Sequence, residues 1–260
     1  HAESYRKIRN TFRYILGNLN DKFEKVDFEK INIKELPELE QYMLYKVYKL
    51  DEAFKKNFKK YNFHTLHKEI LNFCALDLSA FYFDIRKDTL YCDPKESNKR
   101  KSTIKFLNII IEILLKWLAP VLSFTTEEIY SLLKINEKGS IHLEKFPSIP
   151  SKWNNEELGN KWLKLIKIRD KCNSSIELKR ALKEIGSSLE ANLTICLKEN
   201  LITLTKEIDF SELCITSGAK IEKINEKDSE EILVKATKAE GQKCPVCWKI
   251  NINKCERHSI

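Results

Sequence analysis

The longest apolar stretch of the chain is FLNIIIEILLKWLAPVL, residues 106–122. Glu112 and Lys116 interrupt it, and Pro120 ends the helical pattern after about Leu118. A membrane-spanning helix needs about 20 predominantly apolar residues without such interruptions. The stretch therefore predicts a helix that is buried inside a protein core, and we expect no membrane contact.

Four other segments have apolar side chains spaced three and four residues apart, which is typical of amphipathic helices. They cover residues 2–19, 36–61, 64–85 and 123–133. In the last segment we expect Thr125 or Thr126 to be the N-cap, with glutamates in the first turn. Helices of this kind bury one another as a bundle. We therefore expect a mainly α protein with a helical-bundle domain over residues 1–135.

The second half of the chain has a different pattern. Gly139, Pro147 and Pro150 predict a linker over residues 136–155. Beyond the linker we expect one helix and then three strands, in residues 156–183, 188–197, 210–221 and 231–243. This order indicates a small α+β junction domain over residues 156–239.

The C-terminal stretch KCPVCWKININKCERHSI, residues 243–260, contains three of the eight cysteines. Four metal-ligating residues follow one another there as a C-x-x-C pair and a C-x-x-H pair: Cys244, Cys247, Cys255 and His258. Two residues between ligands suit a tight turn that supplies two ligands to one tetrahedral zinc ion. The spacing predicts one structural Zn²⁺, with no open coordination position for catalysis, in a zinc-binding tail over residues 240–260.

A redox-active pair or a disulfide would also explain Cys244 and Cys247. The redox motif normally lies in a βαβ unit, which we do not expect here because Asn251, Asn253 and Lys254 indicate a loop. The other five cysteines are scattered, which suits reduced thiols in the cytosol. The sequence therefore favours a cytoplasmic protein and a tail that is closed by zinc.

The net charge of +8 is distributed unevenly. Residues 1–120 have a net charge of +6 and residues 235–260 have +4, whereas the part between them is slightly acidic. Two separated basic regions suit a polyanion that is contacted at two places. Ordinary solubility charge explains a balance this modest equally well.

Arginines are concentrated in the first predicted helix. Only eight of the 46 basic residues are Arg, and three of the eight are Arg6, Arg9 and Arg13. A guanidinium binds phosphate in a bidentate manner and stacks on bases, which indicates nucleic acid binding. Arginine stems that cover the edge of a core, or that pair with acids, would give the same pattern.

The short motifs that hold phosphate or activate a nucleophile do not occur in the sequence. There is no G-x-G-x-x-G, no G-K-[ST] and no G-x-S-x-G. Five histidines, one of them assigned to zinc, leave little material for a histidine-based catalytic dyad. The sequence by itself indicates a binding module without catalytic residues.

Five stretches resemble, in chain order, successive signatures of the C-terminal part of bacterial isoleucyl-tRNA synthetases. They are SYRKIRNTFRYILGNLND, FYFDIRKDTLYC, WLAPVLSFTTEEIY, IGSSLEANLTI and KAEGQKCPVCW. The third is shared by the related valyl and leucyl enzymes, so it indicates only the superfamily. The last is more specific to the isoleucyl enzymes, and the resemblance spans essentially the whole chain.

The resemblance implies an α-helical anticodon-binding domain of class I synthetases, a junction domain and a zinc-binding tail that helps to hold the anticodon arm of tRNA(Ile). It also implies a monomeric isoleucine-tRNA ligase that uses ATP and Mg²⁺ in a catalytic domain outside this fragment. In this reading we expect the tRNA contacts to be Arg6, Arg9, Asn10, Arg13, Trp248 and Lys249. Trp248 follows a zinc ligand directly, so its indole either stacks on an unpaired base or packs the tail onto the α+β domain.

The match departs from the family at the second ligand pair. Many relatives end in C-x-x-C after a longer insertion, whereas this chain has Cys255-Glu-Arg-His258. The family's H-I-G-H and K-M-S-K-S signatures and its editing domain have no counterpart in the sequence, which is why we expect a fragment. A valyl or leucyl enzyme is one alternative, against which the zinc tail argues, and a freestanding zinc-containing protein-interaction module is another.

Overall fold

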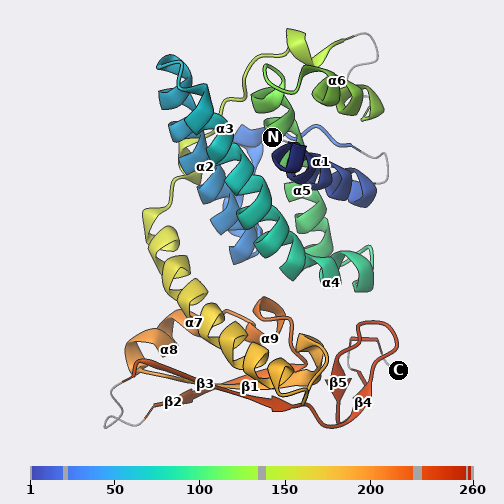
Figure 1. Cartoon of the computed structure of the whole chain (residues 1–260), viewed down its shortest axis with the longest axis vertical. Coiled ribbons are helices and arrows are strands. Elements are labelled where there is room, and N and C mark those ends of the chain that lie inside the picture. The colour runs from blue at the N-terminus through green and yellow to red at the C-terminus, as the bar shows by residue number, and fades with distance from the viewer. Residues whose placement is uncertain (1, 20–22, 134–138, 225–229, 256, 259–260) are drawn as a thin grey trace. The chain divides into compact units, whose positions relative to one another are not determined.

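The computed structural model describes residues 2–19, 23–133, 139–224, 230–255 and 257–258. The chain divides into two compact units, His1–Glu156 and Glu157–Ile260. Helices come first along the chain, and a small sheet with further helices follows (Figure 1). This order confirms the predicted fold class, whereas the finer division into four parts stays a prediction.

The first unit is a bundle of helices around one buried helix. Its described α-helices are α1 Ala2–Leu19, α2 Glu38–Lys59, α3 Phe63–Asn72, α4 Asp84–Cys92, α5 Asn98–Leu118 and α6 Ser123–Leu132. Every residue of α5 from Phe106 to Leu115 is buried, and α5 contacts α1, α2, α4 and α6. A helix that is apolar on all sides must be covered on all sides. The prediction of a buried helix in this stretch is confirmed.

A buried ion pair links α2 to α4 within this bundle. Arg86 Nε and Nη2 donate to the two carboxylate oxygens of Glu40, each at 2.7 Å, and Tyr82 OH donates to Glu40 Oε1 at 2.8 Å. Glu40 and Arg86 are both almost completely inaccessible to solvent. The bidentate geometry and the tyrosine satisfy a carboxylate that would otherwise be buried without partners.

The helix expected over residues 64–85 differs from the structure in length and in type. It continues to Cys92, and between α3 and α4 it contains a π-helical segment, Phe73–Phe83. Within that segment Ser79 Oγ donates to Cys74 O at 2.8 Å, and Thr11 Oγ1 of α1 approaches the same carbonyl at 3.4 Å. Side chains thus occupy an acceptor that an α-helical N–H would otherwise use.

The predicted cap of α6 is wrong. The helix begins at Ser123, and Leu122 occupies the N-cap position without a side-chain hydrogen bond. Thr126 lies inside the first turn, where its hydroxyl donates to Leu122 O at 3.1 Å. Glu127 accepts hydrogen bonds from Ser140 and Ile141 instead of capping the helix, since the helix starts earlier than either threonine.

The segment that follows α6 is part of the first unit and contacts residues 29–31. Residues 139–155 contain two 3₁₀ turns, Ile141–Leu143 and Ser151–Trp153, and the Trp153 side chain is buried. Lys152 Nζ donates to Ile31 O at 3.1 Å and also contacts Glu29 O. The predicted linker therefore makes ordered contacts along the part that is described.

The second unit places one long helix on a three-stranded sheet. Its elements up to the last long strand are α7 Glu156–Ala181, β1 Ala191–Leu197, α8 Glu199–Thr205, α9 Phe210–Leu213, β2 Gly218–Lys223 and β3 Ile232–Lys238. The strand order is β2-β1-β3, with β2 parallel and β3 antiparallel to β1. Alternate β1 residues are buried, and Ser175 of α7 accepts a hydrogen bond from Ala236 N of β3 at 3.0 Å. The predicted helix and two of the three predicted strands are confirmed.

The strand predicted over residues 210–221 is only half correct. Its first part is the short helix α9, because Asp209 is an N-cap that accepts hydrogen bonds from Ser211 N and Glu212 N. Only Gly218–Lys223 forms a strand. The local cap decides the conformation here, and the β-branched residues do not.

The chain ends in a small hairpin that we call the knuckle, residues 242–258. Its strands are β4 Gln242–Lys243 and β5 Ile250–Asn251, so the loop predicted at Asn251 is wrong. Gly241 has φ +125°, and a Cβ on it would lie 2.1 Å from Asn251 O. Only glycine therefore allows the two strands to approach this closely.

Candidate functional site

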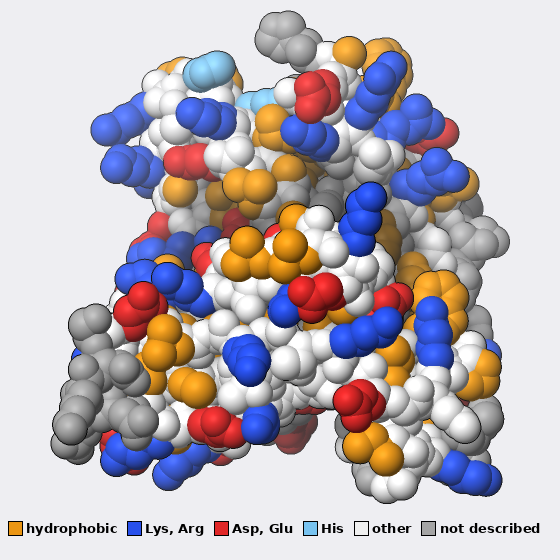
Figure 2. All heavy atoms as spheres, turned by 60° about the horizontal axis from the view of Figure 1, so that its bottom comes forward, with side chains coloured by type: hydrophobic (Ala, Val, Ile, Leu, Met, Phe, Trp, Pro, Cys, Tyr) orange, Lys and Arg blue, Asp and Glu red, His pale blue; other side chains and the backbone are white. Residues whose placement is uncertain are grey.

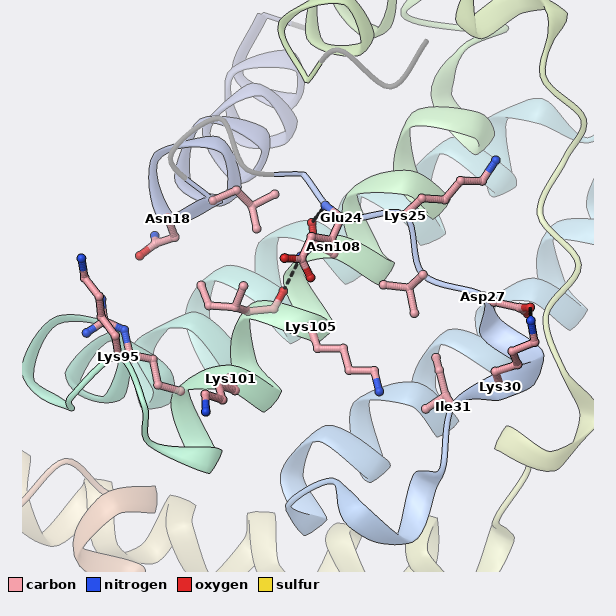
Figure 3. Close-up of a pocket in the computed structure, with 14 residues that line it drawn as sticks. Asn18, Glu24, Lys25, Asp27, Lys30, Ile31, Lys95, Lys101, Lys105 and Asn108 are labelled. Carbon is pink, nitrogen blue, oxygen red and sulfur yellow. Dashed lines mark hydrogen bonds and ion pairs between the residues drawn. The ribbon is translucent and has the colours of Figure 1, made fainter.

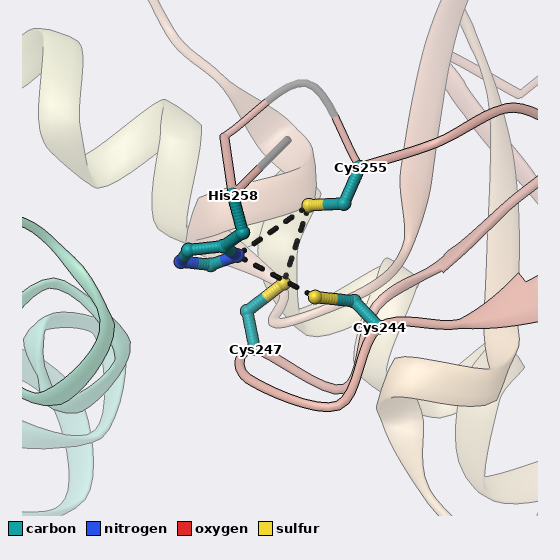
Figure 4. Close-up of side chains that lie close together, drawn as sticks. All are labelled: Cys244, Cys247, Cys255 and His258. Atoms are coloured by element: carbon teal, nitrogen blue, oxygen red, sulfur yellow. Dashed lines mark hydrogen bonds between the residues drawn. The ribbon is translucent and has the colours of Figure 1, made fainter. Parts of the chain in front are cut away.

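Four potential metal ligands converge in the knuckle, as Figure 4 shows. Their ligand atoms all lie within 4.8 Å of one another: Cys244, Cys247, Cys255 and His258. The three cysteines are buried and the histidine is partly exposed. The structure thus brings together all four residues that the spacing predicted as ligands, in a group that could hold a metal ion.

The distances between the ligand atoms fit a tetrahedral centre. Cys247 Sγ lies 3.8 Å from Cys255 Sγ, and His258 Nδ1 lies 3.5 Å from both Cys244 Sγ and Cys255 Sγ. Metal-ligand bonds of about 2.3 Å for sulfur and about 2.05 Å for nitrogen give tetrahedral edges of about 3.8 Å and about 3.6 Å. Three thiols and one imidazole also match the ligands that structural zinc takes.

The surroundings of one of the thiols, that of Cys244, favour its thiolate form. Burial works against ionisation of Cys244, but backbone N–H groups of Cys247 and Val246 and the ring of His258 lower its pKa overall. At Cys247, burial and the neighbouring thiols raise the pKa. The cluster therefore favours ionisation at one cysteine first, as expected when like charges share a small site.

The backbone of the knuckle fixes Trp248 in an unusual conformation. Cys244 N donates to Lys249 O at 2.9 Å, and Trp248 N donates to Cys244 O at 3.0 Å. Trp248 has φ +63°, a region that a residue with a large side chain rarely adopts. Its side chain is 58% exposed. The indole therefore points to solvent instead of filling the interior of the second unit.

Two lysines lie beside this indole and behave differently. Lys243 Nζ lies 5.3 Å from the centroid of the Trp248 ring, which is within cation-π range. Lys249, which the sequence suggested as a phosphate ligand, donates instead to Ser211 Oγ at 3.2 Å. The sequence analysis did not propose Lys243 as a contact residue, although its position directly before the ligand Cys244 could have indicated one.

The second set of predicted contacts lies on α1. Arg6, Arg9, Asn10 and Arg13 are all exposed, whereas Ile8, Phe12 and Ile15 are buried. The spacing of three, four and seven residues puts the four polar side chains on one helix face. Within the described part of the chain, none of the three arginines has a recorded ion pair. The alternative that they pair with acids is therefore not supported there.

Charge on the surface is mixed on the face drawn in Figure 2. Among the side chains that the figure colours, lysines and arginines alternate with acidic and hydrophobic residues. Recognition of an anion on such a face depends on individually placed residues, because opposite charges a few ångströms apart screen one another.

The profile of a family described as "Anticodon-binding domain of tRNA ligase" matches residues 40–195. The chain belongs to this family. The match covers the helical bundle from α2 onward and extends into β1 of the second unit. The knuckle and all of α1 lie outside the matched residues.

Several curated proteins are similar to this chain over 95–100% of its length. The isoleucine-tRNA ligase of Pelagibacter ubique is 62% identical over 259 residues, which is 100% of this chain and 28% of that protein. The isoleucine-tRNA ligases of Brachyspira hyodysenteriae and Agrobacterium fabrum are 41% and 37% identical, and they match 95% and 96% of the chain. The chain spans 26–28% of the length of these relatives. No helix in the described residues is long and apolar enough to cross a membrane.

Proposed function

We propose that this chain is the tRNA-recognition part of an isoleucine-tRNA ligase, which attaches isoleucine to tRNA(Ile) with ATP. Membership of the anticodon-binding family supports tRNA recognition. The similar proteins are isoleucine-tRNA ligases, which supports isoleucine as the amino acid. The ATP and Mg²⁺ chemistry belongs to a catalytic domain, since the chain has no phosphate-holding motif. The partners are tRNA(Ile) and the rest of the synthetase chain, in a monomeric cytoplasmic enzyme.

The metal of the knuckle is one structural Zn²⁺. The donor set and the 3.5 Å and 3.8 Å spacings support zinc, because it prefers thiolate and imidazole in tetrahedral geometry. Four protein ligands leave no open position, so the ion holds the knuckle together instead of activating water. When bound, it fixes the backbone that positions Trp248.

We assign tRNA recognition to two surfaces, one on α1 and one on the knuckle. The arginines of α1 bind phosphates of the anticodon stem, and Asn10 between them supplies an amide for a sugar or base edge. In the knuckle the exposed indole of Trp248 stacks on an unpaired anticodon-loop base, with Lys249 nearby. The exposure of Trp248 supports stacking over the alternative in which the indole packs the knuckle onto the sheet.

Fluorescence anisotropy with labelled transcripts tests the proposal on the 260-residue chain. The expected order of affinity is tRNA(Ile) over tRNA(Val) and over tRNA(Ile) with a replaced anticodon. Preference for tRNA(Val) or tRNA(Leu) favours the related enzymes. Absence of tRNA binding at 50 mM salt favours the freestanding protein-interaction module and refutes the proposal.

A further inference from the structure

A basic pocket of about 750 Å³ opens in the first unit (Figure 3). It lies between the C-terminal end of α1, residues 24–31 and the first half of α5. Six of its lining residues are basic and two are acidic. None of the described residues that line it is aromatic. The pocket therefore offers positive charge without a surface on which a base could stack.

Most of the positive charge around the pocket is not neutralised. Lys30 pairs with Asp27 at 3.2 Å, and Arg100 donates to the backbone oxygen of Asp93. The remaining four basic residues have no recorded ion pair within the described ranges: Lys25, Lys95, Lys101 and Lys105. Against these four, the wall contributes the carboxylate of Glu24. A net positive field of this kind attracts anions.

Lys101 and Lys105 connect this pocket to a neighbouring hollow. Both residues also line a second hollow of about 400 Å³, which contains Asn32, Asn98 and one more acid, Glu35. The Glu35 carboxylate accepts a hydrogen bond from Asn32 at 2.8 Å, so part of its charge is already used. We call the two hollows together the α5 groove. Two hollows that share Lys101 and Lys105 suit an extended anion more than a single small one.

The walls of the α5 groove are held in place by buried contacts. Asn108 is 1% exposed, accepts a hydrogen bond from Glu24 N at 3.0 Å and donates to Ile104 O at 3.2 Å. Figure 3 shows Lys105 extending from α5 toward the segment that carries Ile31. Ile31 is itself buried, and its carbonyl accepts a hydrogen bond from Lys152. Hydrogen bonds and buried side chains therefore hold together the segments that carry the lysines.

We infer that the α5 groove binds the phosphate backbone of RNA, with Lys101 and Lys105 as its central contacts. Four residues of helix separate these lysines by about 6 Å along one face, so they can contact neighbouring phosphates of one strand. Lysine acts as a point charge toward phosphate and does not distinguish bases. The groove therefore adds affinity without sequence preference, and the inference rests on the proposed function.

The test compares two matched double variants of the 260-residue chain. Lys101→Ala/Lys105→Ala removes the central pair, whereas Lys167→Ala/Lys171→Ala removes two exposed lysines with the same spacing on α7. Binding of tRNA(Ile) is measured between 50 and 200 mM salt. The groove variant should lose at least about tenfold in affinity at 100 mM salt, and the salt slope should fall by about 2, because each phosphate contact contributes close to 1.

Two further measurements make the result decisive. Lys101→Arg/Lys105→Arg keeps the charge and should keep the affinity, and thermal melting should show that all variants fold. The groove assignment is overturned if the wild type binds tRNA and the alanine groove variant keeps both its affinity and its salt slope. If the wild type does not bind tRNA, the proposed function fails first and the groove assignment fails with it.

Discussion

The helical bundle and the knuckle are stabilised by different interactions. In the bundle, α5 is buried without interruption from Phe106 to Leu115. Among the described residues of the knuckle, only the three cysteines are buried, whereas Val246, Trp248 and Ile252 are exposed. So little apolar burial cannot offset the entropy of ordering the segment. The bundle can therefore fold on its own core, whereas the knuckle depends on its ligand atoms.

Loss of the metal should have the largest effect. Cys244→Ser removes one of four ligands, and binding of structural zinc supplies about 10–16 kcal/mol of folding free energy in small zinc domains. Hydrogen exchange should show residues 242–258 unprotected, with α5 protected as in the wild type. Mass spectrometry should find one zinc per chain in the wild type and less in the variant.

The matched control is Cys196→Ser, which changes a cysteine of β1 outside the cluster. It should keep one zinc per chain and an ordered knuckle. Wild-type protein purified under reducing conditions without stoichiometric metal would sink the zinc assignment.

The reverse experiment destabilises the bundle and spares the knuckle. Arg86→Met leaves Glu40 buried without its ion-pair partner, which costs about 3–5 kcal/mol. Urea unfolding should show the loss in the helical signal, while zinc content stays unchanged. In the double variant Glu40→Met/Arg86→Met, the orphaned charge is gone and most of the loss should be recovered. An unchanged unfolding midpoint in Arg86→Met contradicts the role given to the pair.

The third change separates the function of the knuckle from its stability. Trp248→Ala should weaken binding to an anticodon-arm RNA by about 1–3 kcal/mol, because one stacked base is lost. Zinc content and melting should be unchanged, since the indole is exposed. Loss of metal or of knuckle order would instead support the packing role, and unchanged affinity would leave recognition to the arginine face of α1.

The smallest effect is expected at Asp209, which caps α9 next to the knuckle. Burial raises the pKa of Asp209, but hydrogen bonds from Ser211 and the charge of Lys249 lower it overall. Because the folded pKa is lowered, the carboxylate stabilises the fold above its ordinary value of 3.8, and this contribution disappears as pH falls through the lowered value.

Asp209→Ala should therefore cost about 1 kcal/mol at pH 7 and less at pH 3. Urea unfolding at the two pH values checks this, with Asp170→Ala on α7 as an exposed control. An equal loss at both pH values would show that the charge of Asp209 does not contribute.

Features that depend on local spacing could be predicted from the sequence. The burial of residues 106–115 followed from composition, because a long apolar run can only be covered by other elements. The metal group followed from two short ligand pairs, since chain geometry brings residues three apart to one centre. The exposed face of α1 followed from helical periodicity in the same way.

Features that depend on distant partners could not be predicted. The π-helical segment involves Thr11 of another helix at the Cys74 carbonyl, and nothing local indicates that contact. Helix α6 begins after Leu122, whose side chain has no group that can cap a helix. Glu127 accepts a hydrogen bond from Ile141 N in a later turn. The lysines of the α5 groove come from segments more than 60 residues apart, so their grouping appears only in the folded chain.

The π-helical segment has a consequence for how the bundle tolerates insertions and deletions. One residue of α-helix rotates the chain by about 100°. The extra width of Phe73–Phe83 therefore sets the rotational phase of α4 relative to α3. If one residue were deleted there, α4 would turn by roughly a quarter of a revolution, and Arg86 would face away from Glu40. The buried ion pair therefore requires this rotational phase. A change in the length of the π-helical segment would separate Arg86 from Glu40, although both residues lie outside the segment.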